Sequence, residues 1–255
     1  MGTDGAAPEI IVEDSADVLA ERTAGRVAAA LVAALAARPV AHLGLTGGSI
    51  LEQALGALRD LPGRDDVDWS RVHLWWADER YVASDSDERN DMAAFRAGLD
   101  ALPLDPANVH RMPAADSDFA DDVELAAQAY ADELAALAAP DEHDDVPHFD
   151  VVLLGVGPDG HCASLFPGHP GVYEREAAVI AVHDSPKPPP TRLSFTFRTL
   201  DAANEVWFVA SGQSKSDAVA RALSGAPKEQ VPAGGPHGRQ HTRWLIDRAA
   251  AAKLP

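Results

Sequence analysis

The fold of this chain is decided by one stretch near its middle, Phe149-Asp150-Val151-Val152-Leu153-Leu154-Gly155. Residues 151–154 are all aliphatic, without polar alternation, which is typical of a parallel strand covered on both faces. Gly155 then opens a glycine-containing turn. The stretch therefore predicts a buried central strand whose carboxyl end leads into a polar loop.

Working outward from this strand, the same rhythm of apolar strand, glycine or polar turn and amphipathic helix recurs in both directions. Such alternation predicts an α/β fold, with a mainly parallel, twisted, Rossmann-like sheet and helices on both of its faces. No linker divides the sequence, so residues 1–255 are predicted to form a single domain. Strands are expected at residues 9–13, 40–45, 71–77, 177–183, 192–197, 205–210 and 242–246, and helices at 17–38, 50–59, 90–99, 117–139 and 215–223.

The chain combines an ordinary globular composition with a strong negative charge. Its formal net charge is −19, from 21 basic and 40 acidic residues, and no basic run offsets it. Such a surface repels nucleic acid and anionic membranes, so neither is expected as a partner. Residues 1–8 lack a signal-peptide pattern, and no apolar run is long enough to span a membrane. With one cysteine, Cys162, a reducing compartment fits best. We expect a soluble cytoplasmic protein, monomeric or a small homo-oligomer.

In parallel α/β sheets the chemistry lies in loops just beyond the carboxyl ends of the strands. The first such loop here is Leu45-Thr46-Gly47-Gly48-Ser49, between a predicted strand and a predicted helix. Paired glycines allow the backbone N–H groups to face a ligand, and a helix N-terminus favours an anion such as phosphate. The alternative is a tight turn followed by a capping box formed by Ser49 and Glu52. The sequence is compatible with both.

The loop after the central strand contains Asp159-Gly160-His161. A carboxylate two residues from a histidine can fix the tautomer of the imidazole for proton transfer. Residues 155–160 also match the dinucleotide pattern GxGxxG, but Pro158 lies inside the turn and the usual acidic residue after a following strand is missing. Cys162 and Ser164 lie outside any nucleophile elbow, so packing or hydrogen bonding is the favoured interpretation for both.

Charged residues follow three other predicted strands. Asp78 and Arg80 can orient a sugar and neutralise an anion, although the spacing alone favours a solvated charged turn. Arg192 and Lys215 are placed to bring positive charge to the same edge of the sheet. The acidic and histidine-containing stretches 141–148 and 237–241 do not have the spacing of zinc ligands, so no metal site is predicted.

These segments, in this order, resemble the 6-phosphogluconolactonase family from about the first predicted strand to the C-terminus. The block DGH-x-ASLFP is its most specific part, and Cys162 stands where the family often has threonine. The matching stretches are LTGGS (45–49), WWADERYV (75–82), SDERN (86–90), GVGPDGHCASLFPGHP (155–170), RLSFTF (192–197), SGQSK (211–215) and WLIDRAA (244–250).

The resemblance implies cofactor-free hydrolysis of 6-phospho-D-glucono-1,5-lactone to 6-phospho-D-gluconate in the pentose phosphate pathway. By this likeness His161 corresponds to the family's proposed general base, and Asp159 orients it. Asp78 and Arg80 would lie beside the sugar ring and the lactone carbonyl, and the resemblance is compatible with contact of Arg80 to either the carbonyl or the phosphate. The phosphate would be surrounded by Thr46, Gly47, Gly48, Ser49, Arg192 and Lys215.

Two alternatives differ in class. Glucosamine-6-phosphate deaminases look similar in the glycine loop and the Asp-Gly-His block, but they carry a glutamate where this chain has Phe166. A phenylalanine cannot supply the extra acid–base group that ring opening and isomerisation need. A non-catalytic sugar-phosphate sensor is the other alternative. Such sensors carry a helix-turn-helix, for which the sequence before the first predicted strand leaves no room.

Overall fold

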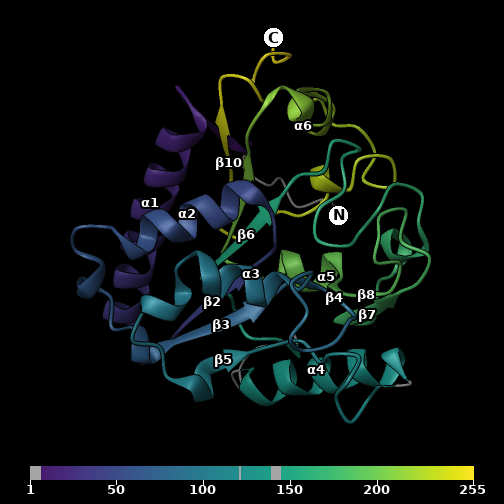
Figure 1. Cartoon of the computed structure of the whole chain (residues 1–255). Helices are drawn as coiled ribbons and strands as arrows, with labels where there is room; N and C mark the ends of the chain where they lie inside the picture. Colours follow the sequence, from purple (N-terminus) through teal and green to yellow (C-terminus); the bar gives the residue numbers. More distant parts are fainter. Residues whose placement is uncertain (1–6, 121, 139–144) are drawn as a thin grey trace.

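A computed structural model describes residues 7–120, 122–138 and 145–255, and within them a seven-stranded parallel sheet forms the centre (Figure 1). Its strand order is β1-β10-β9-β6-β2-β3-β5, with every neighbouring pair parallel. The strands are β1 (Glu9–Glu13), β2 (Ala41–Leu45), β3 (Val72–Trp76), β5 (Val109–His110), β6 (Val151–Gly155), β9 (Glu205–Ala210) and β10 (His241–Asp247).

The central position of β6 follows from its sequence. It lies between β2 and β9, and its side chains are buried on both faces: Val151 and Leu153 on one face, and Val152 and Leu154 on the other. An uninterrupted aliphatic strand is stable only where both faces are covered. The prediction from residues 149–155 is thereby confirmed.

Helices cover both faces of the sheet, as predicted. On one face α1 and α2 pack against each other; α1 also contacts β1, β2 and β10, and α2 contacts β6 and β9. On the other face lies α4, where the Tyr130 hydroxyl accepts the N–H of Trp76 (3.0 Å) and donates to the carbonyl of His110 (2.9 Å). The α-helices are α1 (Ala16–Ala37), α2 (Ser49–Arg59), α3 (Asn90–Ala97), α4 (Val123–Leu137), α5 (Phe197–Asp201) and α6 (Ser216–Leu223).

A second, antiparallel sheet was not predicted. It consists of β4 (Asp78–Arg80), β8 (Arg192–Phe195) and β7 (Val179–Val182), and it lies beside α4 (Figure 1). Residues 78–81 were expected to be a loop, and this was wrong. The chain leaves β3 still extended, because the carbonyl of Ala77 accepts the N–H of Phe195 at 2.7 Å and β4 then pairs with β8. The pairing sets Arg80 directly opposite Arg192.

Other predicted boundaries also need correction. The helix expected from residue 117 begins at Val123, because the Asp122 carboxylate accepts the N–H of Leu125 at 3.0 Å and caps it there. The strand expected over 192–197 ends at Phe195. The Thr196 hydroxyl donates to the carbonyl of Ala177 (2.7 Å), and the short helix α5 follows. The two residues of β5 are too few to show a period in the sequence.

Candidate active site

A cavity of about 300 Å³ opens at the carboxyl ends of β2, β6 and β9. The structure brings nine of the ten predicted site residues to its lining, although they come from five separate parts of the chain. Asp159 is the tenth, and it contacts the site through His161. The nine are Thr46, Gly47, Gly48, Ser49, Asp78, Arg80, His161, Arg192 and Lys215.

The glycine loop joins β2 to α2 along one wall of the cavity. Gly48 has a φ of 128°, which favours glycine, and it is the N-cap of α2 without a side-chain hydrogen bond. The predicted capping box is therefore wrong: Ser49 is the first helical residue rather than the cap. The Thr46 hydroxyl donates to the carbonyl of Leu153 (3.2 Å) and accepts the N–H of Gly155 (3.0 Å), so it ties the loop to β6. The helix N-terminus at the cavity suits an anion.

The Asp-Gly-His turn places His161 on the facing side. Its Nδ1 lies 2.6 Å from Oδ1 of Asp159, which leaves Nε2 as the ring nitrogen available to a ligand. The ring packs over Gly157, where an added Cβ would lie only 1.9 Å from Nδ1. The Phe166 ring lies on another side, with its centroid 4.7 Å from that of the imidazole. The imidazole is thus held in place by one hydrogen bond and two close contacts.

Lys187 is a site residue that the sequence analysis missed. Its Nζ lies 3.3 Å from Oδ1 of Asp159 and 3.0 Å from Nδ1 of His161, and it lines the cavity. Burial favours a higher pKa for Asp159, but the hydrogen bond with His161 and the charge of Lys187 outweigh burial and lower that pKa. The available signal was a lysine inside the proline-rich stretch 186–190, where the prolines restrict the backbone.

Arg192 and Lys215 bring two further cations to the cavity. Arg192 is 5% exposed and donates to backbone carbonyls of the proline-rich stretch, at 3.1–3.2 Å. Burial lowers its pKa, and the charge of Arg80 acts in the same direction. Burial and the nearby charge of Lys187 lower the pKa of Lys215. Cations that are desolvated and close to one another favour an anionic ligand between them.

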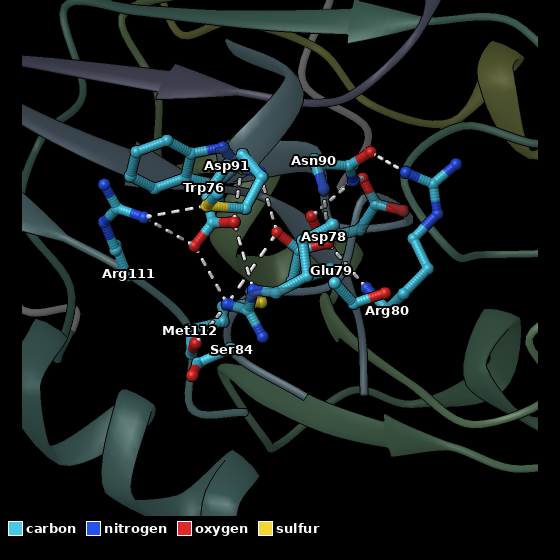
Figure 2. Close-up of polar contacts among 12 residues, drawn as sticks. Trp76, Asp78, Glu79, Arg80, Ser84, Asn90, Asp91, Arg111 and Met112 are labelled. Carbon is cyan, nitrogen blue, oxygen red and sulfur yellow. Dashed lines mark hydrogen bonds and ion pairs between the residues drawn. The ribbon is translucent and has the colours of Figure 1, made fainter. Parts of the chain in front are cut away.

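Asp78 and Arg80 lie in the interior edge of the cavity rather than in a solvated turn. Asp78 is 5% exposed and accepts hydrogen bonds from the Ser164 hydroxyl (2.8 Å) and from Nδ2 of Asn90 (3.2 Å). Arg80 donates to Oδ1 of Asn90 (Figure 2). The sequence analysis did not predict Asn90 as a site residue, although Asn90 begins a predicted helix and ends the family-like stretch SDERN (86–90).

Neither a cysteine or serine nucleophile nor a metal site is supported by the geometry of the described residues. Ser164 and Cys162 are fully buried, and burial raises the pKa of the Cys162 thiol. No group of three His, Cys, Asp or Glu side chains among the described residues could hold a metal ion. Residues 141–144 of the acidic stretch lie outside the described residues. Within the described part of the chain, no helix is long and apolar enough to cross a membrane.

Comparison with known proteins places this geometry in a family. The family described as "Glucosamine-6-phosphate isomerases/6-phosphogluconolactonase" matches residues 14–244. The chain belongs to this family. Among curated relatives, a 6-phosphogluconolactonase of Streptomyces coelicolor is 52% identical over 248 residues, which cover 97% of this chain and 95% of the relative.

Solved structures of both branches of this family have the same fold. The 6-phosphogluconolactonase of Trypanosoma brucei matches with a TM-score of 0.82 and 27% identity, covering 97% of this chain and 99% of the other. A monomeric glucosamine-6-phosphate deaminase matches with a TM-score of 0.77 and 22% identity, covering 96% and 99%. Because both branches share the fold, the site has to discriminate between them.

Proposed function

We propose that this protein hydrolyses 6-phospho-D-glucono-1,5-lactone to 6-phospho-D-gluconate. The observation that carries the proposal is the pair Asp159–His161, whose imidazole lines the same cavity as the cations Arg80, Lys187, Arg192 and Lys215. The name of the Streptomyces coelicolor relative supports the choice of substrate. One group for proton transfer and one anion site are what a phosphorylated lactone requires.

In the proposed reaction the phosphate binds the glycine loop, Arg192 and Lys215, and the lactone ring extends toward His161. Nε2 of His161 removes a proton from water as the water oxygen forms a bond to the carbonyl carbon. Arg80 stabilises the negative charge that develops on the carbonyl oxygen. The bond from the carbonyl carbon to the ring oxygen then breaks, and the imidazolium returns the proton to that oxygen.

The remaining groups prepare His161 for this role. The Asp159 carboxylate selects the tautomer with the proton on Nδ1 and stabilises the imidazolium that forms. Lys187 lies against the same carboxylate and limits its freedom to move. In the proposed reaction the imidazole of His161 activates the water, so the mechanism requires no cofactor or metal. We place it in the cytoplasm and assign residues 1–255 to one catalytic domain.

Phe166 argues against the deaminase alternative. Its ring is 1% exposed and lies between the imidazole of His161 and the guanidinium of Arg192, 5.6 Å from the guanidinium carbon. By the resemblance described in the sequence analysis, the deaminases carry a glutamate at this place. An apolar ring there offers no proton to an amino sugar. Against the sensor alternative stands the oriented Asp159–His161 pair, which binding alone does not need.

The test is a hydrolysis assay at neutral pH, corrected for the spontaneous hydrolysis of the lactone. We expect saturable turnover of 6-phosphogluconolactone and a much lower kcat/KM for gluconolactone without phosphate, because each charge-assisted phosphate contact contributes about 1.5–3 kcal/mol. Glucosamine 6-phosphate, incubated in parallel, is expected to release no ammonia. Binding of the lactone without turnover above the blank would instead support the sensor.

A further inference from the structure

Asn90, the first residue of α3, connects the two charged side chains at the inner edge of the cavity. Its Nδ2 donates to the backbone carbonyl of Asp78 (2.9 Å) and to Oδ1 of the same residue (3.2 Å). Its Oδ1 accepts from the guanidinium of Arg80 (Figure 2). The side chain is 3% exposed and lines the cavity. One amide therefore contacts both an anion and a cation of the site.

Only a carboxamide of this length fits these two neighbours. An aspartate could accept from Arg80 but would bring a second carboxylate against Asp78, and an aliphatic side chain would leave both charged groups without this partner. The amide also lies against the glycine loop. A Cβ on Gly47 would come within 1.8 Å of Oδ1 of Asn90. Asn90 thus links the loop after β2 to β4.

The backbone beneath Asn90 is fixed by a buried carboxylate. Oε1 of Glu79 accepts the N–H groups of Asn90 (2.7 Å) and Arg80 (2.8 Å), and Oε2 accepts that of Asp91 (2.9 Å). Glu79 is fully buried, and burial raises its pKa to about 7 although the charge of Arg89 opposes this. Arg89 holds Asp91 through two hydrogen bonds of 3.0 Å. This network joins the first turn of α3 to β4.

Capping of α3 does not explain the hydrogen bonds of the amide. The side chain of Asn90 makes its contacts with Asp78 and Arg80, whereas the backbone N–H groups of the first turn of α3 are satisfied by Glu79. Helix α3 is therefore capped by Glu79 and not by the amide. What the amide adds is a fixed direction for the Arg80 guanidinium and the Asp78 carboxylate.

We propose that Asn90 is a positioning residue for lactone hydrolysis, which holds Arg80 and Asp78 in the orientation that the reacting carbonyl requires. This inference rests on the proposed function of the site. Misplacement of a group at the reacting centre by about 1 Å can cost roughly a hundredfold in rate. Asn90→Ala should therefore lower kcat about 10- to 100-fold while the KM for the phosphorylated lactone changes by no more than about threefold.

A double-mutant cycle separates positioning from general damage. If Asn90 acts through Arg80, the variant Asn90→Ala/Arg80→Ala should lose at least about tenfold less kcat than the product of the two single losses. The matched control pairs Asn90→Ala with Lys215→Ala, which comes from the segment after β9 and should combine multiplicatively in kcat/KM. Thermal unfolding followed by circular dichroism accompanies each variant. Should Asn90→Ala not fold, Asn90→Ser replaces it, since the shorter hydroxyl side chain cannot bridge both partners.

The outcomes distinguish failure of the Asn90 inference from failure of the proposed function. An active wild type with less-than-multiplicative losses for Asn90 and Arg80 supports the inference. An active wild type with multiplicative losses, or a folded Asn90 variant with normal kcat, overturns it and leaves the proposed function standing. A wild type without lactone hydrolysis above the blank overturns the proposed function itself.

Discussion

Gly157→Ala should impair the proposed base, His161, by displacing its imidazole while leaving the residue itself unchanged. Gly157 lies directly beneath the imidazole of His161, and an added Cβ would meet Nδ1 at 1.9 Å, Cε1 at 2.1 Å and Oδ1 of Asp159 at 2.4 Å. Cβ atoms essentially never approach other atoms to less than 3.0 Å, so the ring and the carboxylate must both shift. A shift of about 1 Å would be needed to relieve the overlap with the ring.

This displacement sets the expected size of the effect. A group misplaced by about 1 Å at the reacting centre can cost roughly a hundredfold, or about 2.7 kcal/mol of transition-state stabilisation. The phosphate contacts proposed for Arg192 and Lys215 lie on other elements, so KM should change little. His161→Ala sets the lower limit, because loss of a general base typically costs 10²- to 10⁴-fold. Gly157→Ala should fall between wild type and His161→Ala.

The assay measures kcat and KM for 6-phosphogluconolactone, with circular dichroism to verify the fold. The matched control is Gly25→Ala in α1, where an added Cβ would meet nothing within 4 Å. That variant should keep wild-type kcat and gain slightly in stability, because alanine favours helix over glycine. A folded Gly157→Ala enzyme with normal kcat would refute the placement of His161 as the base.

Three further predictions follow from the cavity and its surroundings. Lys215→Ala should raise KM about 10- to 100-fold with a smaller effect on kcat, whereas an unchanged KM would remove Lys215 from the phosphate site. Activity should survive prolonged dialysis against EDTA; a loss that zinc restores would contradict a mechanism based on imidazole and water alone. The third concerns His42. Its pKa is lowered to about 3 by burial and by the charges of His73, His110 and Arg38. In the unfolded chain His42 is protonated near its ordinary pKa of about 6.5, whereas in the folded protein it stays neutral. The free energy of unfolding therefore has its full value above about pH 6.5 and decreases as the pH falls below it. Between pH 7 and 5, the wild type should therefore lose about 2 kcal/mol more unfolding free energy than His42→Gln in urea titrations; equal losses would contradict this.

The sequence predicts best what is determined locally. Strand β6 could be predicted because four aliphatic residues in a row are typical of a strand covered on both faces. The glycine loop could be predicted because its paired glycines lie between a strand and a helix. Active sites of parallel α/β sheets lie at the carboxyl ends of the strands, and from this we predicted site residues that are distant in the sequence. Nine of them line one cavity.

What the sequence could not predict depends on pairing between distant segments. The antiparallel sheet forms because β4 pairs with β8, and the three residues of β4 are too few to show a periodicity that predicts this pairing. Asn90 and Lys187 become site residues only through this arrangement, since one follows β4 and the other precedes β8 along the chain. Their residue types alone, a polar residue at a predicted helix start and a lysine among prolines, are common on protein surfaces.

The division of labour between the two sheets connects the fold to the proposed chemistry. The parallel sheet supplies the glycine loop, the Asp-Gly-His turn and Lys215, all from connections that follow its strands. The antiparallel sheet supplies Asp78, Arg80 and Arg192 from paired strands whose register fixes the two arginines opposite each other. Two like charges at adjacent positions repel each other, so other groups must hold each guanidinium in place or an anion must offset the repulsion. Here Asn90 holds Arg80, and backbone carbonyls of the proline-rich stretch hold Arg192, so both guanidinium groups are oriented before a substrate arrives. Preorganised donors of this kind stabilise developing charge without a reorganisation cost during the reaction, and in the proposed mechanism they add to the effect of the general base.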